Sequence, residues 1–189
     1  MKLIEITEDK YNVAIELAYA KCNNVTGKKI YKQNKCFIHE DALPKLLSAI
    51  YLANALGYKF KIYDAYRPSL AQEILWKFCP DKNFITPPDI GSPHSRGIAV
   101  DLTLMKNHKI VDMGTNFDYL YKESHHGNTD ISIAAQKNRM ILLGIMTASG
   151  WDFYKNEWWH YQLHNSKTWP LIYDKKIQKT IMGETKIIK

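Results

Sequence analysis

The chain has 189 residues, of which 46% are hydrophobic and 24% charged, a balance typical of one soluble globular domain. No run approaches the roughly 18 uncharged apolar residues that a membrane helix needs, and the first ten residues become acidic before an apolar core develops, which argues against a secretory signal. The net charge of +7 comes from scattered basic residues and a basic C-terminal tail of about 175–189 without a nucleic-acid-binding motif, so we expect a solvated surface and no nucleic-acid partner.

The three cysteines bear on the compartment in which the protein works. Cys22, Cys36 and Cys79 are odd in number and widely spaced, and they form no CxxC pair. This pattern is typical of free thiols in a reducing compartment. We therefore expect a cytoplasmic protein with a single domain over residues 1–189 and no membrane contact. The sequence carries no signal for the oligomeric state.

The first half of the chain contains candidate strands and amphipathic helices. Residues 11–19 alternate apolar and polar side chains, which favours a half-buried strand, although a short helix also fits. An apolar stripe predicts a helix that starts at Asp41 and stops at Gly57. Residues 58–65 alternate again and predict a strand, after which Pro68 opens a second helix.

The second half of the chain begins with a predicted loop at residues 86–97, which contains three prolines and two glycines. The best strand candidate follows at residues 98–104, and helical spacing predicts a long helix over residues 130–149. Residues 151–154 and 158–163 predict a pair of strands around a turn. Because few strands are separated by helical crossovers, we expect an α+β fold in which helices pack on a small, mostly antiparallel sheet.

Two distant segments supply candidate metal ligands. The Pro/Gly-rich loop places His94 just before the predicted strand that carries Asp101, and the segment EWWHY places His160 three residues after Glu157. Two imidazoles and one carboxylate are a sufficient protein shell for a catalytic zinc ion, with the fourth position left to water. Glu157 would then be free to act as a base.

Each of these residues taken alone also fits a structural role. His94 is more simply a hydrogen-bonded loop residue, and Asp101 could pair with an arginine to offset its burial in a strand. Glu157 and His160 would share one face of a helix but would point to opposite sides of a strand, unless a bulge or strand start turns one back. The aromatic segment by itself equally fits core packing.

In combination the motifs closely resemble those of the zinc D,D-peptidases, and most nearly the VanX-type D-alanyl-D-alanine dipeptidases. The family pattern SxHxxGxAxD corresponds to residues 92–101, DLTL follows at residues 101–104, and EWWHY stands at residues 157–161. Residues 66–68, Tyr-Arg-Pro at the end of a predicted strand, also match. The matches keep the family's order from about residue 19 to residue 161. The resemblance implies a zinc-dependent dipeptidase that hydrolyses D-Ala-D-Ala to two D-alanines.

The resemblance also implies roles for individual residues in catalysis. His94, Asp101 and His160 would bind one zinc ion per chain. Glu157 would be the general base that deprotonates the attacking water and later protonates the leaving amine. Arg67 would stabilise the oxyanion that forms when the carbonyl is attacked.

Substrate recognition would involve a second set of matching residues. Asp118 would receive the ammonium group of the dipeptide, assisted by Ser92 and Tyr19, and Asp64 would lie beside the site. A structural ion pair with Asp64 is the alternative role for Arg67. Because the loss of a buried charge-assisted hydrogen bond is costly, peptides blocked at the N-terminus should be poor substrates.

Two other functions fit the same residues. A D,D-carboxypeptidase that acts on longer peptidoglycan peptides would use the same ligands with an open amine side, but the expected cytoplasmic location argues against it. A non-catalytic zinc-binding module would need neither Glu157 nor Arg67.

The segment 79–91 is shorter than the corresponding segment of the glycopeptide-resistance enzymes and could border the substrate cleft. The substrate preference is therefore less firmly predicted than the zinc site. The sequence assigns no role to His125 and His126.

Overall fold

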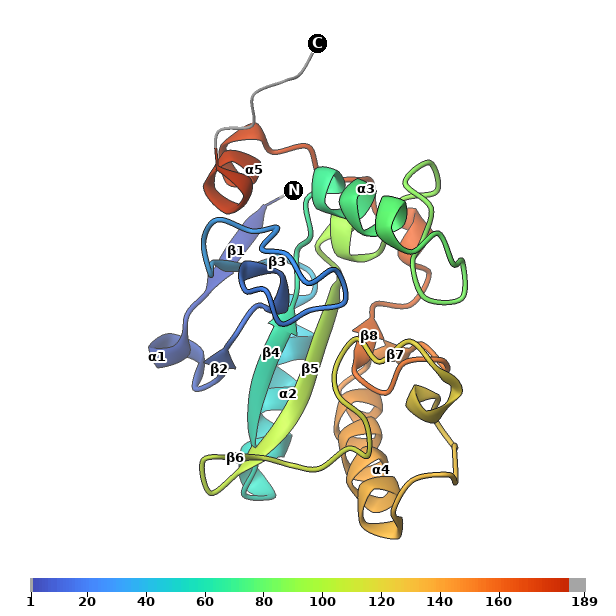
Figure 1. The fold of residues 1–189 in the computed structure, drawn as a ribbon. Coiled ribbons are helices and arrows are strands. Elements are labelled where there is room, and N and C mark those ends of the chain that lie inside the picture. The colour runs from blue at the N-terminus through green and yellow to red at the C-terminus, as the bar shows by residue number, and fades with distance from the viewer. Residues whose placement is uncertain (1, 184–189) are drawn as a thin grey trace.

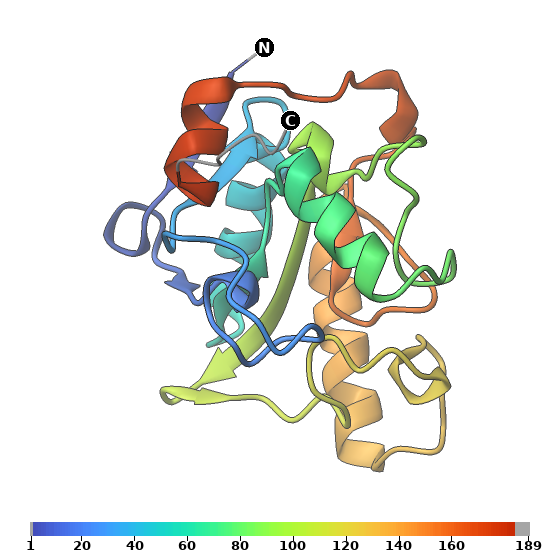
Figure 2. The same ribbon diagram turned by 45° about the horizontal axis from the view of Figure 1, so that its top comes forward.

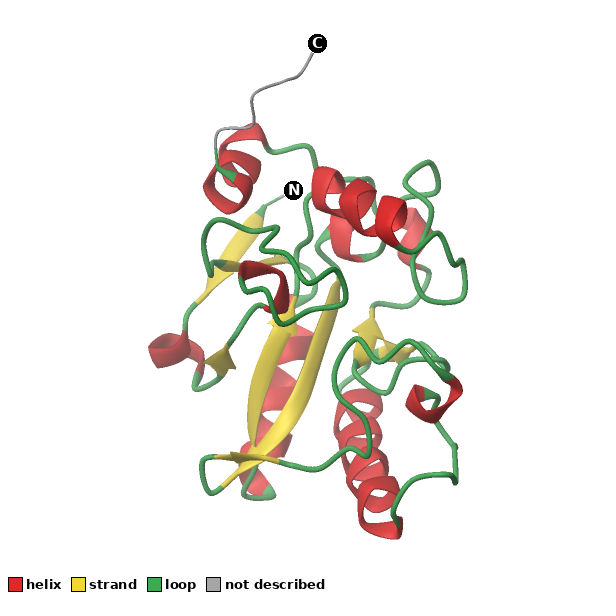
Figure 3. Ribbon diagram, viewed as in Figure 1, coloured by secondary structure: helices red, strands yellow, loops and turns green. Residues whose placement is uncertain are grey.

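The computed structural model of this chain describes residues 2–183. Its helices are α1 Glu8–Tyr11, α2 Leu43–Ala55, α3 Ser69–Phe78, α4 Ile133–Ala148 and α5 Lys175–Met182 (Figure 1). Its strands are β1 Leu3–Ile6, β2 Ala14–Ile15, β3 Cys36–His39, β4 Lys59–Asp64, β5 Ala99–Lys106, β6 Lys109–Ile110, β7 Asp152–Phe153 and β8 His160–Gln162 (Figure 3). Four short 3-10 turns complete the described elements: η1 Ala18–Ala20, η2 His94–Arg96, η3 Lys122–Ser124 and η4 Ser166–Thr168.

A six-stranded mixed sheet forms the centre of the fold. Its strand order is β2-β4-β5-β8-β7, and β6 pairs with β5 outside this path. The β2–β4 pair is parallel, and every other pair in the sheet is antiparallel. β1 and β3 form a separate antiparallel pair. The predicted α+β class, with helices on a mostly antiparallel sheet, is confirmed.

The central strand β5 brings distant parts of the chain together. It pairs with β4 on one side and with β8 on the other, so that Asp101 lies opposite both Asp64 and His160. The register between β4 and β5 shifts after Ile62, at the end of β4 that approaches Asp101. Because cross-strand partners are held close together, this register gathers polar side chains from three strands at one end of the sheet.

Helices α2 and α4 contact each other and the sheet, with α2 against β4 and α4 against β7. In Figure 1 α2 lies behind β4 and β5 and α4 lies below β7 and β8, while the segment that contains η1 passes in front of β4. Helix α3 lies beyond the end of the sheet where β4 ends and β5 begins (Figure 2). The start of β5, where Asp101 lies, is therefore the end of the strand that faces α3.

Among the described residues, no helix combines the length and hydropathy that a membrane span requires.

Local signals explain the bounds of the predicted helices. Helix α2 has a proline in its first turn and ends shortly before Gly57, which has a φ of 75°. Helix α4 begins after Ser132, whose side chain accepts a hydrogen bond from the backbone N–H of Ala135. It ends before Gly150, which has a φ of 83°. The predicted helices α2, α3 and α4 are confirmed, with α4 three residues shorter at its start.

The N-terminal segment differs from the prediction of one strand over residues 11–19. Helix α1 ends at Tyr11, Asn12 adopts a left-handed φ of 50°, and β2 contains only two residues before η1 begins at Ala18. The left-handed residue ends α1, so the alternating side chains do not belong to one extended segment. The short strands β1 and β3 were not predicted, because their four residues show no clean alternation of buried and exposed side chains.

The C-terminal segment contains a helix that the sequence analysis treated only as a basic tail. Helix α5 starts after Asp174, whose carboxylate accepts a hydrogen bond from the backbone N–H of Ile177. Its side chains Ile181 and Met182 are buried. The helix therefore covers the core with one face and exposes its lysines on the other. Residues 184–189 of the predicted tail lie outside the described residues.

Candidate active site

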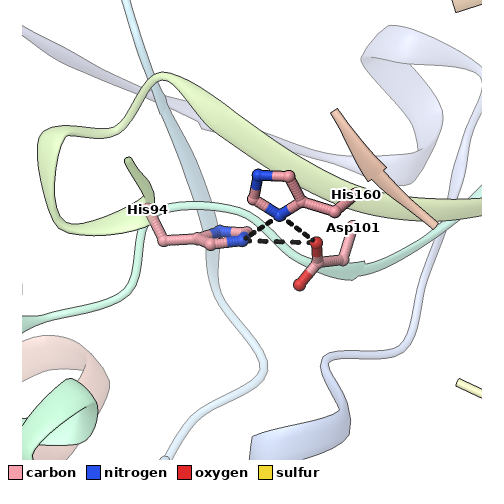
Figure 4. A group of neighbouring side chains, drawn as sticks. All are labelled: His94, Asp101 and His160. Atoms are coloured by element: carbon pink, nitrogen blue, oxygen red, sulfur yellow. Dashed lines mark hydrogen bonds and ion pairs between the residues drawn. The ribbon is translucent and has the colours of Figure 1, made fainter. Parts of the chain in front are cut away.

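Three donor atoms converge where β5 meets β8 (Figure 4). Nε2 of His94 lies 3.2 Å from Oδ1 of Asp101 and 3.1 Å from Nδ1 of His160. Nδ1 of His160 lies 3.0 Å from the same Asp101 oxygen. All three side chains are buried. Within residues 2–183 they are the only group of three or more such side chains that could hold a metal ion.

The spacing of the three donors fits a tetrahedral metal ion. Metal–ligand bonds of about 2.0–2.1 Å at tetrahedral angles place neighbouring ligand atoms about 3.3 Å apart. The separations of 3.0–3.2 Å in this cluster are close to that value. The fold holds the donors rigidly, because Asp101 and His160 are cross-strand partners and His94 lies in η2, immediately before β5.

The second nitrogen of each imidazole has its own hydrogen bond. Nδ1 of His94 donates to the carbonyl oxygen of Ala65 over 2.7 Å, which leaves the lone pair of Nε2 facing the cluster. Nε2 of His160 donates to Oε1 of Gln162 over 3.1 Å, which leaves the lone pair of Nδ1 facing the cluster. Both rings are therefore held in the tautomer that a metal ligand requires.

The carboxylate of Asp101 stays ionised despite its burial. Burial acts to raise its pKa, but the adjacent His94 and His160 outweigh that effect and hold the pKa well below its usual range. Its second oxygen accepts a longer hydrogen bond, 3.4 Å, from Nη2 of Arg67. The cluster therefore has one anionic donor, which favours a cation at its centre.

Glu157 lies beside the cluster, in the turn that leads into β8. Its Oε2 is 3.9 Å from Nδ1 of His160, since the strand starts only at His160 and the preceding turn brings Glu157 back to the same side. Burial raises the pKa of Glu157 to about 8, and the charges of Asp101 and Asp118 act in the same direction. A cation held by the neighbouring donors would lower this pKa by direct electrostatic attraction.

Arg67 is fixed beside the cluster by three acceptors, one of which is Asp101. Its Nε donates to Asp64 over 2.7 Å, and its Nη1 donates to Gln72 over 3.0 Å. The guanidinium carbon also lies 5.0 Å from the centre of the Tyr19 ring. Arg67 thus forms the ion pair with Asp64 that the sequence analysis weighed, and it also lines the cavity beside the cluster.

A cavity of about 270 Å³ opens over these groups. Residues 79–91 border it, as the sequence analysis anticipated, and they contribute Lys82, Phe84, Ile85, Thr86, Ile90 and Gly91. Of the predicted substrate-binding residues, Asp118, Ser92 and Tyr19 line the cavity. Asp64 is not part of the lining; its oxygens accept hydrogen bonds from Arg67 and Tyr31.

Asp118 and Tyr19 meet at the side of the cavity. The hydroxyl of Tyr19 donates to Oδ1 of Asp118 over 3.1 Å, and the backbone N–H of Val25 donates to Oδ2 over 3.3 Å. Burial raises the pKa of Asp118 to about 7, an effect that Arg67 opposes. The Ser92 hydroxyl accepts a hydrogen bond from the backbone N–H of His94 over 3.2 Å.

Gln72 and Gln162 are two further polar residues of the site that were not predicted from the sequence. Gln72 lies in α3 and bridges Arg67 to the carbonyl oxygen of Thr86, a contact for which the sequence carries no signal. Gln162 stands two residues after His160 in one strand, and the period-two rule could have placed both side chains on the same face.

His125 and His126 lie outside the cavity lining. The ring of His126 packs against Phe153, with 5.0 Å between the ring centres. Burial and the nearby charge of Arg139 lower the pKa of His126 to about 4. This histidine is therefore neutral near pH 7.

Known proteins match the chain over most of its length. A peptidase M15 family model, described as D-ala-D-ala dipeptidase, matches residues 1–182. The D-alanyl-D-alanine dipeptidase of Escherichia coli (strain K12) is 42% identical over 174 residues, which cover 92% of this chain and 90% of that protein. The D-alanyl-D-alanine dipeptidase of Enterococcus faecalis (strain ATCC 700802 / V583) is 34% identical over 180 residues, which cover 84% of this chain and 89% of that protein. This breadth confirms the resemblance noted in the sequence, and the chain belongs to the D-Ala-D-Ala dipeptidase family of M15 metallopeptidases.

Proposed function

We propose that this protein hydrolyses D-Ala-D-Ala to two D-alanines, with one zinc ion bound by His94, Asp101 and His160. The observation that carries the proposal is the convergence of these three buried donors within 3.0–3.2 Å of one another at a cavity. Two imidazoles, one carboxylate and an open fourth position are typical of a catalytic zinc site. Bound zinc supplies an acidified water molecule and a Lewis acid for the scissile carbonyl.

Glu157 is the proposed general base. Its carboxylate is within reach of a water molecule beside the donors, since Oε2 is 3.9 Å from Nδ1 of His160. The group removes a proton from the attacking water and then returns it to the leaving amine. Its raised pKa of about 8 supports the second step, and a cation beside it supports the first by favouring the ionised carboxylate.

Arg67 is the proposed oxyanion-stabilising group. Its hydrogen bonds to Asp64 and Gln72 leave the side chain little freedom to reorient, so its charge is already in place when negative charge develops on the substrate carbonyl oxygen. Asp64, predicted from the resemblance to lie beside the site with the substrate-recognition residues, acts in this proposal through Arg67 as a positioning residue.

Asp118 is the proposed receptor for the substrate ammonium. The charged ammonium would stabilise the ionised form of this buried carboxylate, whose pKa burial raises to about 7 against the opposing charge of Arg67. Tyr19 orients one carboxylate oxygen, and Ser92 lines the same cavity with its hydroxyl proton available as a donor. This recognition of a free amine favours a dipeptidase over a D,D-carboxypeptidase that trims longer peptides.

A cytoplasmic location is part of the proposal. Cys22, Cys36 and Cys79 are all free thiols, as is typical of a reducing compartment.

The direct test compares D-alanine release from free D-Ala-D-Ala and from N-acetyl-D-Ala-D-Ala, each with and without a metal chelator. We expect chelator-sensitive hydrolysis of the free dipeptide and at least about 100-fold slower hydrolysis of the acetylated one, because acetylation removes a charge-assisted contact with Asp118. Equal rates on both substrates would indicate a D,D-carboxypeptidase. No hydrolysis of either substrate by zinc-loaded protein would leave a non-catalytic zinc-binding module.

A further inference from the structure

The two histidines of the donor cluster are oriented by different kinds of acceptor. The acceptor for His94 is the backbone carbonyl of Ala65, which every residue type at position 65 would supply. The acceptor for His160 is the side-chain amide oxygen of Gln162. Among the described residues, Gln162 is thus the only side chain that sets the tautomer of a candidate ligand histidine.

The geometry of β8 makes this contact specific to position 162. His160 and Gln162 are two residues apart in one strand, so their side chains leave the backbone on the same face. His160 is 8% exposed, and Gln162 Oε1 is the acceptor bonded to its Nε2. Without that acceptor the ring would keep a buried N–H unpaired, or it would move its proton to Nδ1, the atom that faces Asp101 and His94.

The chemical nature of the acceptor also matters. The amide oxygen orients the ring without adding a negative charge to a site that already contains Asp101 and Glu157. A carboxylate at the same position would orient the ring equally well and would make the imidazole a more basic donor. An apolar side chain of similar length would do neither.

We propose that Gln162 is a positioning residue that holds Nδ1 of His160 ready to bind the metal and thereby sets the affinity of the site. This inference depends on one part of the proposed function, the binding of zinc by the same three donors, and not on the identity of the substrate. Gln162 also lines the cavity, so a direct contact between its amide N–H and the substrate is the competing role.

The test compares Gln162→Met, which removes the acceptor, with Gln162→Glu, which keeps it. Gln136→Met is the matched control, because Gln136 is also a partly buried glutamine but bonds only backbone carbonyl oxygens near the start of α4. Zinc affinity is measured by competition with a chromophoric chelator, and the visible spectrum of the cobalt-substituted proteins reports the ligand geometry. D-alanine release at saturating zinc completes the comparison.

We expect Gln162→Met to weaken zinc binding by roughly 10- to 100-fold and to change the cobalt spectrum. Gln162→Glu should bind zinc at least as tightly as the parent protein, and Gln136→Met should match the parent in affinity and spectrum. Unfolding of the metal-free proteins is followed in parallel, so that a loss confined to metal binding is separated from a general loss of structure.

Three results would overturn the inference. The first is a Gln162→Met variant whose zinc affinity stays within about threefold of the parent and whose KM alone is raised. Such a change in affinity is smaller than the loss of a hydrogen-bond partner of a metal ligand causes. Gln162 would then be a substrate contact. The second is a Gln162→Glu variant that binds zinc as weakly as Gln162→Met. The third is a loss of stability in the metal-free Gln162→Met protein that is matched in metal-free Gln162→Glu and is large enough to account for the weaker zinc binding of Gln162→Met. A parent protein that binds no zinc would instead overturn the proposed function itself.

Discussion

The two sides of the cavity bury a carboxylate in opposite ways. Asp101 lies in the central strand β5, where His94 and His160 hold its pKa well below the usual range. Asp118 lies in a loop with a left-handed φ of 61°, and burial raises its pKa to about 7. On the donor side, Asp101 and His160 stand on paired strands and His94 stands in η2, just before β5. A bound cation would balance the negative charge of Asp101 there. The Asp118 side is built on loops and lacks a fully compensating cation.

This difference separates the proposed chemistry from the proposed recognition. A metal site needs donors fixed to a few tenths of an ångström, which strand pairing between β5 and β8 provides. A recognition site has to distinguish substrates, and loops can vary for that purpose without disturbing the sheet. In the proposed mechanism, the substrate ammonium supplies the positive charge that the buried, hydrogen-bonded Asp118 carboxylate lacks in the free protein.

The largest expected effect comes from breaking the donor side. His160→Ala should lose measurable zinc binding and lower kcat/KM by at least about a thousandfold, because the Lewis acid contributes several kcal/mol to the barrier. Metal content per chain and D-alanine release measure the two losses. His164→Ala is the control, since His164 is exposed and its nearest ionic partner is Asp152 at 3.8 Å. Full activity of zinc-free His160→Ala protein would contradict the assignment of this ligand.

Removing the base without removing the metal sharpens the comparison within the donor side. Glu157→Gln should keep its zinc and lower kcat by about 10²- to 10⁴-fold, the range for loss of a general acid–base group. The amide preserves the size of the side chain but cannot accept the proton of the water. Metal analysis together with kcat measures both properties. A variant that retains zinc and the parent kcat would remove Glu157 from the mechanism.

Changing the recognition side should alter selectivity more than chemistry. Asp118→Asn should lower kcat/KM for free D-Ala-D-Ala by about 10- to 100-fold, because a hydrogen bond to a charged group is replaced by a neutral one. It should leave zinc content unchanged and bring the rates on the free and the N-acetylated dipeptide closer together. If the preference for the free amine stayed at its parent value, another group would have to bind the ammonium.

The smallest expected change is in stability, and its sign depends on pH. The pKa of Asp118 is raised from 3.8 to about 7, so the folded protein favours the protonated carboxyl. The corresponding stability is fully present below about pH 4 and is lost as the pH rises through 7. Asp118→Asn cannot ionise, so its Tm relative to the parent should be higher by a few degrees at pH 8 than at pH 5. Thermal unfolding without substrate measures this, and an unchanged Tm difference across that range would argue that Asp118 is not destabilised by burial.

The donor side could be predicted from the sequence far better than its surroundings. The resemblance of the combined motifs to the zinc D,D-peptidases singled out His94 and Asp101, and the aspartate inside a strand was a further signal, because such a residue needs a partner when it is buried. The orientation of Glu157 could not be predicted, since it depends on where β8 begins. The hydrogen-bond partners of Arg67 and His94 could not be predicted either, because Gln72 and the Ala65 carbonyl come close to them only through the folded arrangement of α3, β4 and η2.

The fold shows the same division between regular and irregular segments. Long periodic segments such as α2, α4 and β5 were predicted, because their patterns repeat over several turns or pleats. The prediction over residues 11–19 failed at Asn12, where one left-handed residue ends α1 and interrupts the extended backbone without changing the hydrophobic pattern.

The central claim is that one zinc ion, held by the His-Asp-His cluster, is required for dipeptide hydrolysis. The most direct measurement adds zinc stepwise to metal-free protein and follows D-alanine release from D-Ala-D-Ala. We predict that activity rises linearly and reaches a plateau at one zinc ion per chain. Full activity in the metal-free protein, or a plateau only at two ions per chain, would contradict the claim.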